Sequence, residues 1–375
     1  MKHESCIKRF KDVSCFMFHD LRKLDWWLLT PVLALFLASL LNLYGIGGFD
    51  SFFIKQLIFV LVGLVLLLFF VSIDFRIFRE SSILPSLLYV ASLIFLFGTL
   101  YSSEVRGIKA WFFIGSFGFE PSEITKLALI LFLAKFFSSN GGQRTNQPFS
   151  LGISLIYTLI PIGFILLQPD FGSAAVLGAI WLSALMNFKI KKTHMLFSTG
   201  VLVLLGIVIW IFMLAPYQKA RFTAFLDPLE DPRGSGFQNL QAQISVGSGN
   251  WLGYGVQNAT QVKLGYLSEP RNDFAFAAFA QQFGFLGTSL VVILYGLFLY
   301  RLSSIGIFTK DRFVHIFVFG FLIFISTHLI INIGMNIGVL PVTGIPLSFF
   351  SYGGSHLLTL MSGLGIVQSI KVHTS

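Results

Sequence analysis

The segment FIKQLIFVLVGLVLLLFFVSI, residues 53–73, decides the fold class of this chain. From Leu57 to Val71 it contains only apolar residues and one glycine. A helix needs about 20 apolar residues to cross a bilayer core that is about 30 Å thick. We therefore expect residues 53–73 to form a membrane-spanning helix.

Apolar windows of similar character recur on both sides of this segment. They occupy residues 26–46, 83–100, 124–137, 151–167, 174–188, 195–215, 274–300, 313–333 and 357–370. Some are short or contain Gly and Pro, so the expected count is about nine to eleven. The sequence predicts an all-α integral membrane protein with about ten transmembrane helices, built as a single polytopic membrane domain over residues 1–375.

The composition excludes a water-soluble globule. Hydrophobic residues make up 55% of the 375 residues, charged residues make up 11%, and the mean hydropathy is +0.80. Soluble domains carry about 25% charged residues, which cover the surface that meets water. The polar surface available to this chain is too small for such a fold.

Basic residues favour one side of the predicted membrane domain. With residues 1–25 as a cytoplasmic tail, the short outer loops hold only Lys55, Arg106 and Lys109, and most other basic residues are cytoplasmic. The positive-inside rule therefore predicts that both termini are cytoplasmic. The net charge of +9 then reflects membrane topology, so we expect no nucleic-acid partner.

Two segments on the predicted outer side interrupt the pattern of apolar windows. Residues 217–272 form a large polar extracytoplasmic loop between the seventh and eighth helices, and loops of this length are usually functional. Residues 338–354, GVLPVTGIPLSFFSYGG, carry no charge but repeated Gly and Pro. Irregular backbone at membrane depth must be buried in protein, so we expect this segment to dip into the outer face.

Asp273 lies at the outer mouth of the eighth predicted helix. A carboxylate at a helix start caps free N–H groups, which stabilises the helix by about 1 kcal/mol. Alternatively, it acts as a general base where a membrane-bound substrate meets water. Position alone favours the cap.

Lys126 and Asp170 lie on the same side at a similar depth. A lysine inside the fourth helix either marks a functional site, with Glu123 as its partner one turn earlier, or extends to the membrane surface. Asp170 stands in a turn between the fifth and sixth helices, where turn chemistry also explains it. Convergence of Lys126, Asp170 and Asp273 is what a site between helices would need.

Three basic residues of the large loop suit an anionic ligand, because the Arg fork matches phosphate oxygens. These are Arg221, Lys263 and Arg271, and solvated loop charge is the alternative. The seven His and two Cys residues show no zinc-type ligand spacing, so we assign no metal ligands. The sequence does not identify a cofactor, and a divalent cation is one alternative.

Short motifs follow one another in order along nearly the whole chain. They are SIDFR (72–76), PSEITKLA (121–128), LQPDFG (167–172), AFLDP (224–228), ISVGSG (244–249), NDFAFA (272–277), NIGM (332–335), LPVTGIPL (340–347) and SYGGS (351–355). This set resembles the SEDS family (shape, elongation, division and sporulation) of bacterial cell-wall polymerases. Residues 259–261, ATQ, are closer to its elongation branch than to its division branch.

The resemblance implies a peptidoglycan glycosyltransferase that polymerises lipid II during cell-wall elongation. It implies Asp273, Lys126 and Asp170 as catalytic residues. The substrate-binding residues assigned with it are Glu123, Arg221, Gln261, Arg271 and Ser351. It also implies a location in the bacterial cytoplasmic (inner) membrane, contact with membrane lipid, and a class B penicillin-binding protein as transpeptidase partner.

In the implied reaction, the lipid-linked glycan strand is the donor, and Asp273 takes a proton from the attacking hydroxyl of lipid II. One inverting displacement then releases undecaprenyl pyrophosphate, whose charge is stabilised by Lys126, Arg221 or Arg271. The family usually has His-Thr before this Asp and two Glu after it, where this chain has Arg271-Asn272 and Gln281-Gln282. Two rival functions are a lipid II flippase and a non-catalytic membrane scaffold for a transpeptidase.

Overall fold

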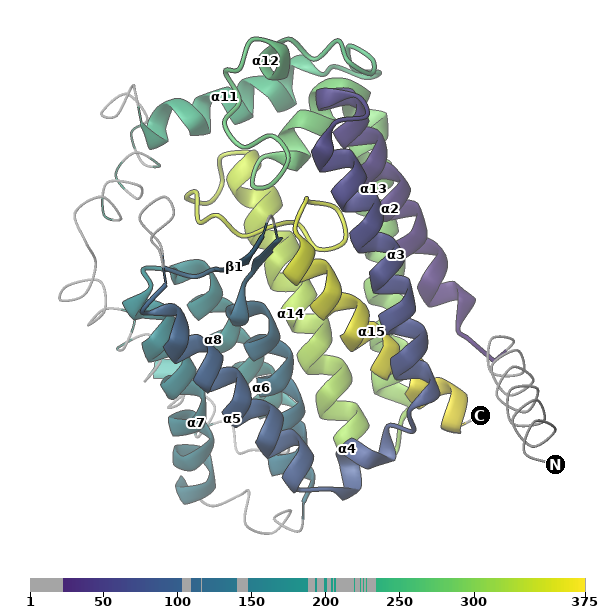
Figure 1. Ribbon diagram of the computed structural model, residues 1–375, viewed down its shortest axis with the longest axis vertical. Coiled ribbons are helices and arrows are strands. Elements are labelled where there is room, and N and C mark those ends of the chain that lie inside the picture. The colour runs from purple at the N-terminus through teal and green to yellow at the C-terminus, as the bar shows by residue number, and fades with distance from the viewer. Residues whose placement is uncertain are drawn as a thin grey trace.

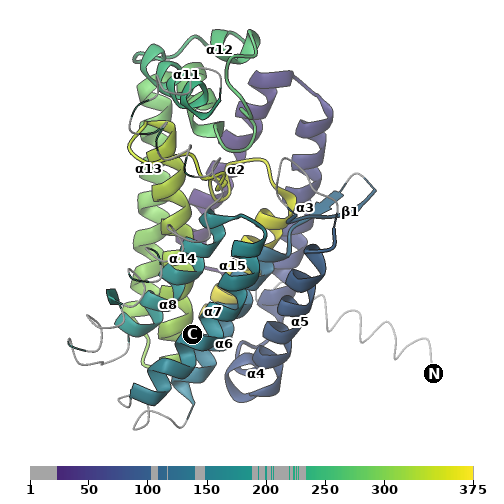
Figure 2. The same ribbon diagram turned by 90° about the vertical axis from the view of Figure 1, so that its left-hand side faces the viewer.

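The computed structural model describes residues 23–102, 109–115, 117–139, 148–187 and 234–374, with a few single residues between positions 193 and 227. These residues are almost entirely helical (Figure 1, Figure 2). The helices are α2 (Trp26–Gly47), α3 (Ser51–Ser72), α4 (Arg76–Glu80), α5 (Ile83–Thr99), α6 (Pro121–Ser138), α7 (Pro148–Leu167), α8 (Phe171–Met186), α11 (Ser235–Ser248), α12 (Thr260–Lys263), α13 (Ala275–Phe308), α14 (Arg312–Asn336) and α15 (Gly354–Thr374).

Helices coincide with the predicted apolar windows wherever the structure describes them. Within that part of the chain, five helices are long and apolar enough to cross a membrane, namely α2, α3, α7, α13 and α14. Helices α5 and α8 are apolar but shorter. The chain is a multi-pass helical membrane protein. The structure describes only a few single residues of the window 195–215, so the count of ten and the cytoplasmic termini remain predictions.

The helices pack around α14 and α15 in the middle of the bundle. Helix α14 contacts α6, α8 and α13, while α15 contacts α3 and α6. Figure 1 shows α2 and α13 on one side of this pair and α5 to α8 on the other. Apolar side chains on the outer helices stay exposed, among them Phe69, Ile94, Leu290 and Leu297. Such a surface suits contact with lipid tails.

The end of the bundle that carries α11 and α12 is called the outer end here, following the predicted topology (Figure 1). The loop 217–272 has structure of its own there, because its described part contains both of these helices. A two-stranded antiparallel hairpin also forms on this side, from β1 (Phe112–Ile114) and β2 (Phe117–Phe119). This short hairpin was not expected from the sequence, but the described architecture is otherwise helical, as the all-α prediction requires. Its turn contains Gly115, which adopts a φ of 62° that a side chain would disfavour.

Helix α13 is broken near its outer end at Gly284, which has a φ of 65°. Residues of the large loop fill the break. The backbone N–H groups of Phe285 and Leu286 donate to the carbonyls of Asn250 (2.8 Å) and Trp251 (3.1 Å). The break therefore fixes the outer loop directly to a membrane helix.

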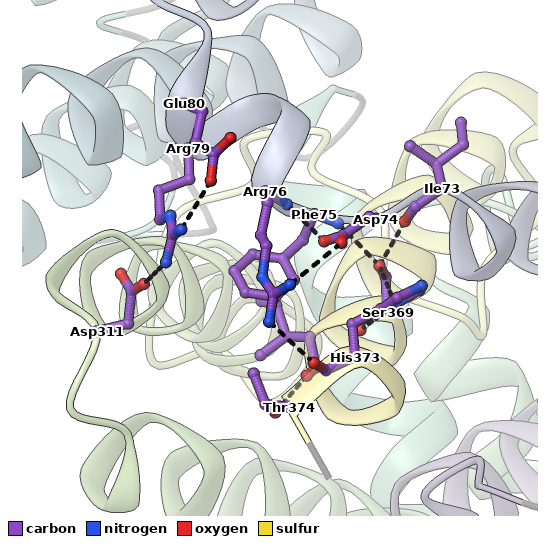
Figure 3. A network of polar contacts seen from close by, with 11 residues as sticks. Ile73, Asp74, Phe75, Arg76, Arg79, Glu80, Asp311, Ser369, His373 and Thr374 are labelled. Atoms are coloured by element: carbon purple, nitrogen blue, oxygen red, sulfur yellow. Dashed lines mark hydrogen bonds and ion pairs between the residues drawn. The ribbon is translucent and has the colours of Figure 1, made fainter.

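The opposite, inner end is held by polar contacts around the short helix α4 (Figure 3). Arg79 Nη1 pairs with Asp311 Oδ2 at 2.8 Å, and Asp311 also caps the start of α14. The hydroxyl of Ser369 on α15 donates to the carbonyl of Ile73 at 2.5 Å. The first turn of α2 lies at this same end, because Asp25 N donates to Gln368 Oε1 of α15 at 2.9 Å. The start of α2 and the end of α15 therefore share one side.

Candidate functional site

Helix α6 begins directly after β2, with Pro121 in its first turn, where a missing N–H group has no consequence. Glu120, which precedes the helix, donates its backbone N–H to Ser355 Oγ at 3.0 Å. Its carboxylate accepts a 2.7 Å hydrogen bond from Ser122 Oγ. Burial, together with the nearby Glu123 carboxylate, raises the pKa of Glu120 to about 8. Burial therefore favours the protonated form of Glu120.

Lys126 and Glu123 form an ion pair inside the bundle. The Nζ–Oε1 distance is 2.8 Å, and only 1% and 3% of the two side chains are exposed. Lys126 therefore does not extend to the membrane surface, and that alternative is wrong. The partner expected from the three-residue spacing, Glu123, is the partner found.

Two histidines complete this buried cluster. His356 Nδ1 donates to Glu123 Oε2 at 2.8 Å, while Lys126 Nζ lies 3.5 Å from His328 Nε2. The two imidazole rings are stacked, with centroids 4.5 Å apart. Their remaining nitrogens contact the segment 338–354: His328 Nδ1 lies 3.0 Å from the Pro346 carbonyl, and His356 Nε2 lies 3.2 Å from Ser348 Oγ.

The donor set of this cluster resembles that of a divalent-cation site. Glu123, His328 and His356 each offer a ligand atom, and these atoms lie within 4.8 Å of one another. However, Lys126 Nζ already contacts Glu123 and His328. Its positive charge opposes a second cation at the same place. The arrangement fits a charge-balanced cluster of side chains better than a metal centre.

Asp273 precedes α13, which begins at Ala275 with Phe274 in the N-cap position. Asp273 therefore stands one residue before the N-cap position, and its roles as a cap and as a general base both remain predictions. Its backbone carbonyl accepts hydrogen bonds of 3.0 Å from the side-chain amides of Asn332 and Asn336 on α14. A Cβ atom built on Gly344 would lie 3.8 Å from Asp273 Oδ2, so the carboxylate adjoins the segment 338–354.

The segment 338–354 joins the three predicted catalytic residues. Asn332 Nδ2 links the Asp273 carbonyl to that of Ile345, at 3.0 and 2.8 Å. His328 links Lys126 to the next residue, Pro346. This segment has no helix or strand, yet its residues from Ile345 to Phe350 are mostly buried. Residues 345–350 therefore lie inside the protein, as irregular backbone at membrane depth requires.

Asp170 reaches the same segment through its helix. Its carboxylate caps α8, accepting a 3.0 Å hydrogen bond from Ser173 N. A Cβ on Gly172, two residues later, would lie 2.6 Å from Ile345 Cγ1, so only glycine allows this close approach. The structure thus gathers Asp170, Lys126 and Asp273 around one segment.

The predicted substrate-binding residues take different positions. Arg271 Nη2 pairs with Asp50 Oδ2 at 2.6 Å, and 28% of the Arg271 side chain stays exposed. Ser351 Oγ donates to the Asn272 carbonyl at 2.7 Å, tying the SYGGS motif to the residue before Asp273. Gln261 lies on α12, and its Oε1 atom is buried without a hydrogen-bond partner among the described residues. Arg221 lies outside the described residues.

The two glutamines that replace the family's glutamates have structural partners. Gln281 Oε1 accepts from Gln261 N at 3.1 Å, and Gln282 Nε2 donates to Asn42 Oδ1 at 3.0 Å. Both side chains are fully buried. Neutral amides can make these contacts without burying a charge. The two positions join α12 and α2 to α13.

An apolar cavity of about 280 Å³ adjoins the buried cluster. Helices α3, α5, α6 and α15 line it, with Phe70, Leu88, Leu131 and Ile366 among the lining residues. Ile124 and Leu127, which neighbour Glu123 and Lys126 in sequence, also line it. Cavities with this chemistry accept aliphatic chains.

His328 and His356 are the residues that reasoning from the sequence missed. The search for closely spaced zinc ligands passed over them, since they lie on different helices, α14 and α15. A signal was present, because His328 stands inside the apolar window 313–333. Ionisable residues inside membrane spans face the protein interior and pair with one another.

Comparisons with known proteins identify similar sequences and a similar solved structure. The family model for cell cycle proteins of the FtsW, RodA and SpoVE type matches residues 21–375. Stage V sporulation protein E of Bacillus subtilis is 33% identical over 326 residues, covering 86% of this chain and 88% of that protein. Peptidoglycan glycosyltransferase MrdB of Escherichia coli K12 is 32% identical over 362 residues, covering 95% of both chains. A chain of a solved peptidoglycan synthase complex, described as coordinating polymerization and crosslinking, is 29% identical with a TM-score of 0.78, covering 93% of this chain and 97% of that one.

Proposed function

Since the chain belongs to the SEDS family of cell cycle proteins, which includes FtsW, RodA and SpoVE, and is a peptidoglycan glycosyltransferase, we propose that it polymerises lipid II with Asp273 as the general base. The observation that carries the proposal is the setting of Asp273. Its backbone is held by two asparagines of α14, and its carboxylate adjoins the segment around Gly344 at the outer end.

A general base must be fixed within hydrogen-bond reach of the proton that it removes. The fixed backbone of Asp273 supports this role, because small displacements of a catalytic group reduce rates strongly. The attacking hydroxyl belongs to the incoming lipid II, and the leaving group is the pyrophosphate of the lipid-linked glycan strand. One displacement inverts the anomeric centre, so no covalent enzyme intermediate is needed.

The lipid tails of both substrates need an apolar environment beside a polar reaction site. The cavity between α3, α5, α6 and α15 has the right lining for part of one isoprenoid chain. It adjoins the α6 residues that carry the buried ion pair. Holding a tail there would place its sugar at the outer surface and make the encounter with Asp273 effectively intramolecular.

The basic residues divide between two roles in this proposal. Lys126 is fully buried with Glu123 and His328 as neighbours, so it acts through them and not on the pyrophosphate. Arg271 precedes Asp273 by two residues and is partly exposed. Its guanidinium is therefore the described group that we assign to the developing pyrophosphate charge.

The partner and the location follow from the same family membership. The matched synthase complex couples polymerization to crosslinking. We propose a class B penicillin-binding protein as the crosslinking partner of this chain, and the bacterial cytoplasmic membrane as its location. We also propose a role in elongation, from the resemblance of residues 259–261 to the elongation branch of the family.

Glycan synthesis by the purified chain, reconstituted with a class B partner and supplied with lipid II, tests the proposal. We expect a polymer ladder from the wild type and none from Asp273→Asn or Asp273→Ala, with thermal stability and partner binding retained. Normal polymer from Asp273→Asn would disprove the general-base role. Translocation of lipid II across vesicle membranes without polymer formation would favour a flippase. Absence of both activities in the wild type would favour a scaffold.

A further inference from the structure

The buried cluster connects α6 to the segment 338–354 by two parallel routes. In the first, Lys126 Nζ contacts His328 Nε2 at 3.5 Å, and His328 Nδ1 contacts the Pro346 carbonyl at 3.0 Å. A lysine ammonium has only donors, so Nε2 is the acceptor and the imidazole proton lies on Nδ1. That proton is then donated to the Pro346 carbonyl.

The second route runs through Glu123. An ionised carboxylate only accepts, so His356 Nδ1 carries the proton that is donated to Glu123 Oε2 at 2.8 Å. In the neutral ring the other nitrogen, Nε2, accepts from Ser348 Oγ at 3.2 Å. Both histidines are neutral in this scheme. The charges of Lys126 and Glu123 balance, and every polar atom of the cluster has a partner.

Pro346 and Ser348 need these partners because they stand in irregular backbone inside the protein. The Tyr295 hydroxyl donates to the carbonyl of Ser348, and Ser351 Oγ accepts from Leu347 N at 3.0 Å. The adjoining residue, Ile345, is tied by Asn332 to the Asp273 carbonyl. Any shift of the segment is therefore passed to the backbone of Asp273.

We infer that His328 and His356 are positioning residues, which hold residues 345–348 on the Lys126–Glu123 pair and thereby fix Asp273. We call these two histidines the histidine clamp. The consequence for catalysis rests on the proposed function. The contacts made by the histidine clamp are a property of the fold and do not depend on the proposed function.

Leucine and asparagine variants separate positioning from mere filling of space. His328→Leu and His356→Leu remove both polar contacts of each ring. The asparagine amide nitrogen reaches roughly the Nδ1 position, so His328→Asn keeps the Pro346 contact and His356→Asn keeps the Glu123 contact. We expect turnover at saturating lipid II to fall about tenfold or more in the leucine variants, with KM within about twofold. The asparagine variants should recover part of the turnover.

The His356–Ser348 contact offers a sharper test. Ser348→Ala and His356→Asn each remove this one hydrogen bond, from opposite sides. Their effects on turnover should therefore match, and the double variant should be no worse than either single variant. Additive losses would overturn the assigned contact. His315→Asn is the matched control, because His315 contacts the Gly306 carbonyl at the inner end, and its turnover should equal that of the wild type.

Hydrogen–deuterium exchange of the peptide covering residues 345–351 tests the clamp without any catalytic readout. Exchange should be faster in both leucine variants than in the wild type and unchanged in His315→Asn. If the wild type makes no polymer, the proposed function fails while the exchange result still decides on the clamp. Wild-type turnover and wild-type exchange in the leucine variants would overturn the inference.

Discussion

The side-chain amide of Asn332 donates a 3.0 Å hydrogen bond to the backbone carbonyl of Asp273. The same nitrogen lies 2.8 Å from the Ile345 carbonyl, and Asn332 is fully buried. One side chain of α14 therefore joins the start of α13 to the segment 338–354. The catalytic carboxylate that we propose owes its position to a residue far away in the sequence.

Replacing Asn332 should damage both stability and activity. Asn332→Leu leaves the Ile345 carbonyl without this donor, and a buried unsatisfied polar group costs about 1–3 kcal/mol. We expect a lower melting temperature and polymerisation reduced by about tenfold or more. The control is Asn187→Leu, which removes a 2.9 Å contact with the Ser183 carbonyl at the far end of α8. Wild-type turnover in Asn332→Leu would show that Asp273 is held without this link.

Much of the fold could be predicted from hydropathy alone, because lipid demands long apolar helices. The predicted window 26–46 and helix α2, Trp26–Gly47, nearly coincide. The break of α13 at Gly284 could not be predicted, since its partners are residues 250–255 of a distant loop. The hairpin at Phe112–Phe119 could not be predicted either, because strands this short show no alternation of apolar and polar residues.

The contacts of the candidate site likewise divide into those that the sequence could predict and those that it could not. A spacing of three residues was enough to pair Lys126 with Glu123, because that spacing places both on one helix face. The histidine clamp depends on the packing of α6, α14 and α15, which no local pattern encodes. The resemblance assigned Arg271 to substrate, but only the structure revealed that Asp50 holds it.

The topology can be tested with cysteines in a chain whose Cys6 and Cys15 are replaced by serine. Val339 is 62% exposed at the outer end, so Val339→Cys should react with an impermeant thiol reagent added to intact cells. Lys310→Cys, in the exposed link between α13 and α14, should not react. Ser348 is unsuitable because it is fully buried. Labelling at position 310 from outside would contradict the predicted orientation.

The inner end offers a test of fold stability that is separate from catalysis. Arg79→Ala and Asp311→Asn both remove an ion pair that is partly exposed, so each should lower stability by about 0–1 kcal/mol. Asp311→Ala also removes the cap on Phe313 N, a further loss of about 1 kcal/mol. Melting temperatures measured in detergent give the order of stability of the three variants. Equal melting temperatures for Asp311→Ala and Asp311→Asn would contradict the capping role.

Glu120 should make stability depend on pH. Its pKa is raised from 4.5 to about 8 in the folded protein, so folding favours the protonated form. The stability that this group contributes is fully present below pH 4.5, declines as pH rises, and is lost above about pH 8. Glu120→Gln cannot titrate, so its melting temperature should fall less than that of the wild type between pH 5 and about 8. Parallel melting curves for the two proteins would remove Glu120 as the cause.

Lys126 should act as a precisely placed partner of Glu123 and not as a basic anchor. Lys126→Met leaves Glu123 as a buried charge without its main partner, which destabilises by about 3–5 kcal/mol. The double variant Lys126→Met/Glu123→Gln removes both charges, so it should regain most of that stability while polymerisation stays lost. Lys126→Arg keeps the charge, but the broad guanidinium does not fit a site where Lys126 is fully buried between Glu123 and His328, and we expect most activity to be lost. Lipid II polymerisation and detergent melting of the three variants measure these effects. Full activity in Lys126→Arg would show that any basic side chain suffices, and the assigned contacts would then be irrelevant to catalysis.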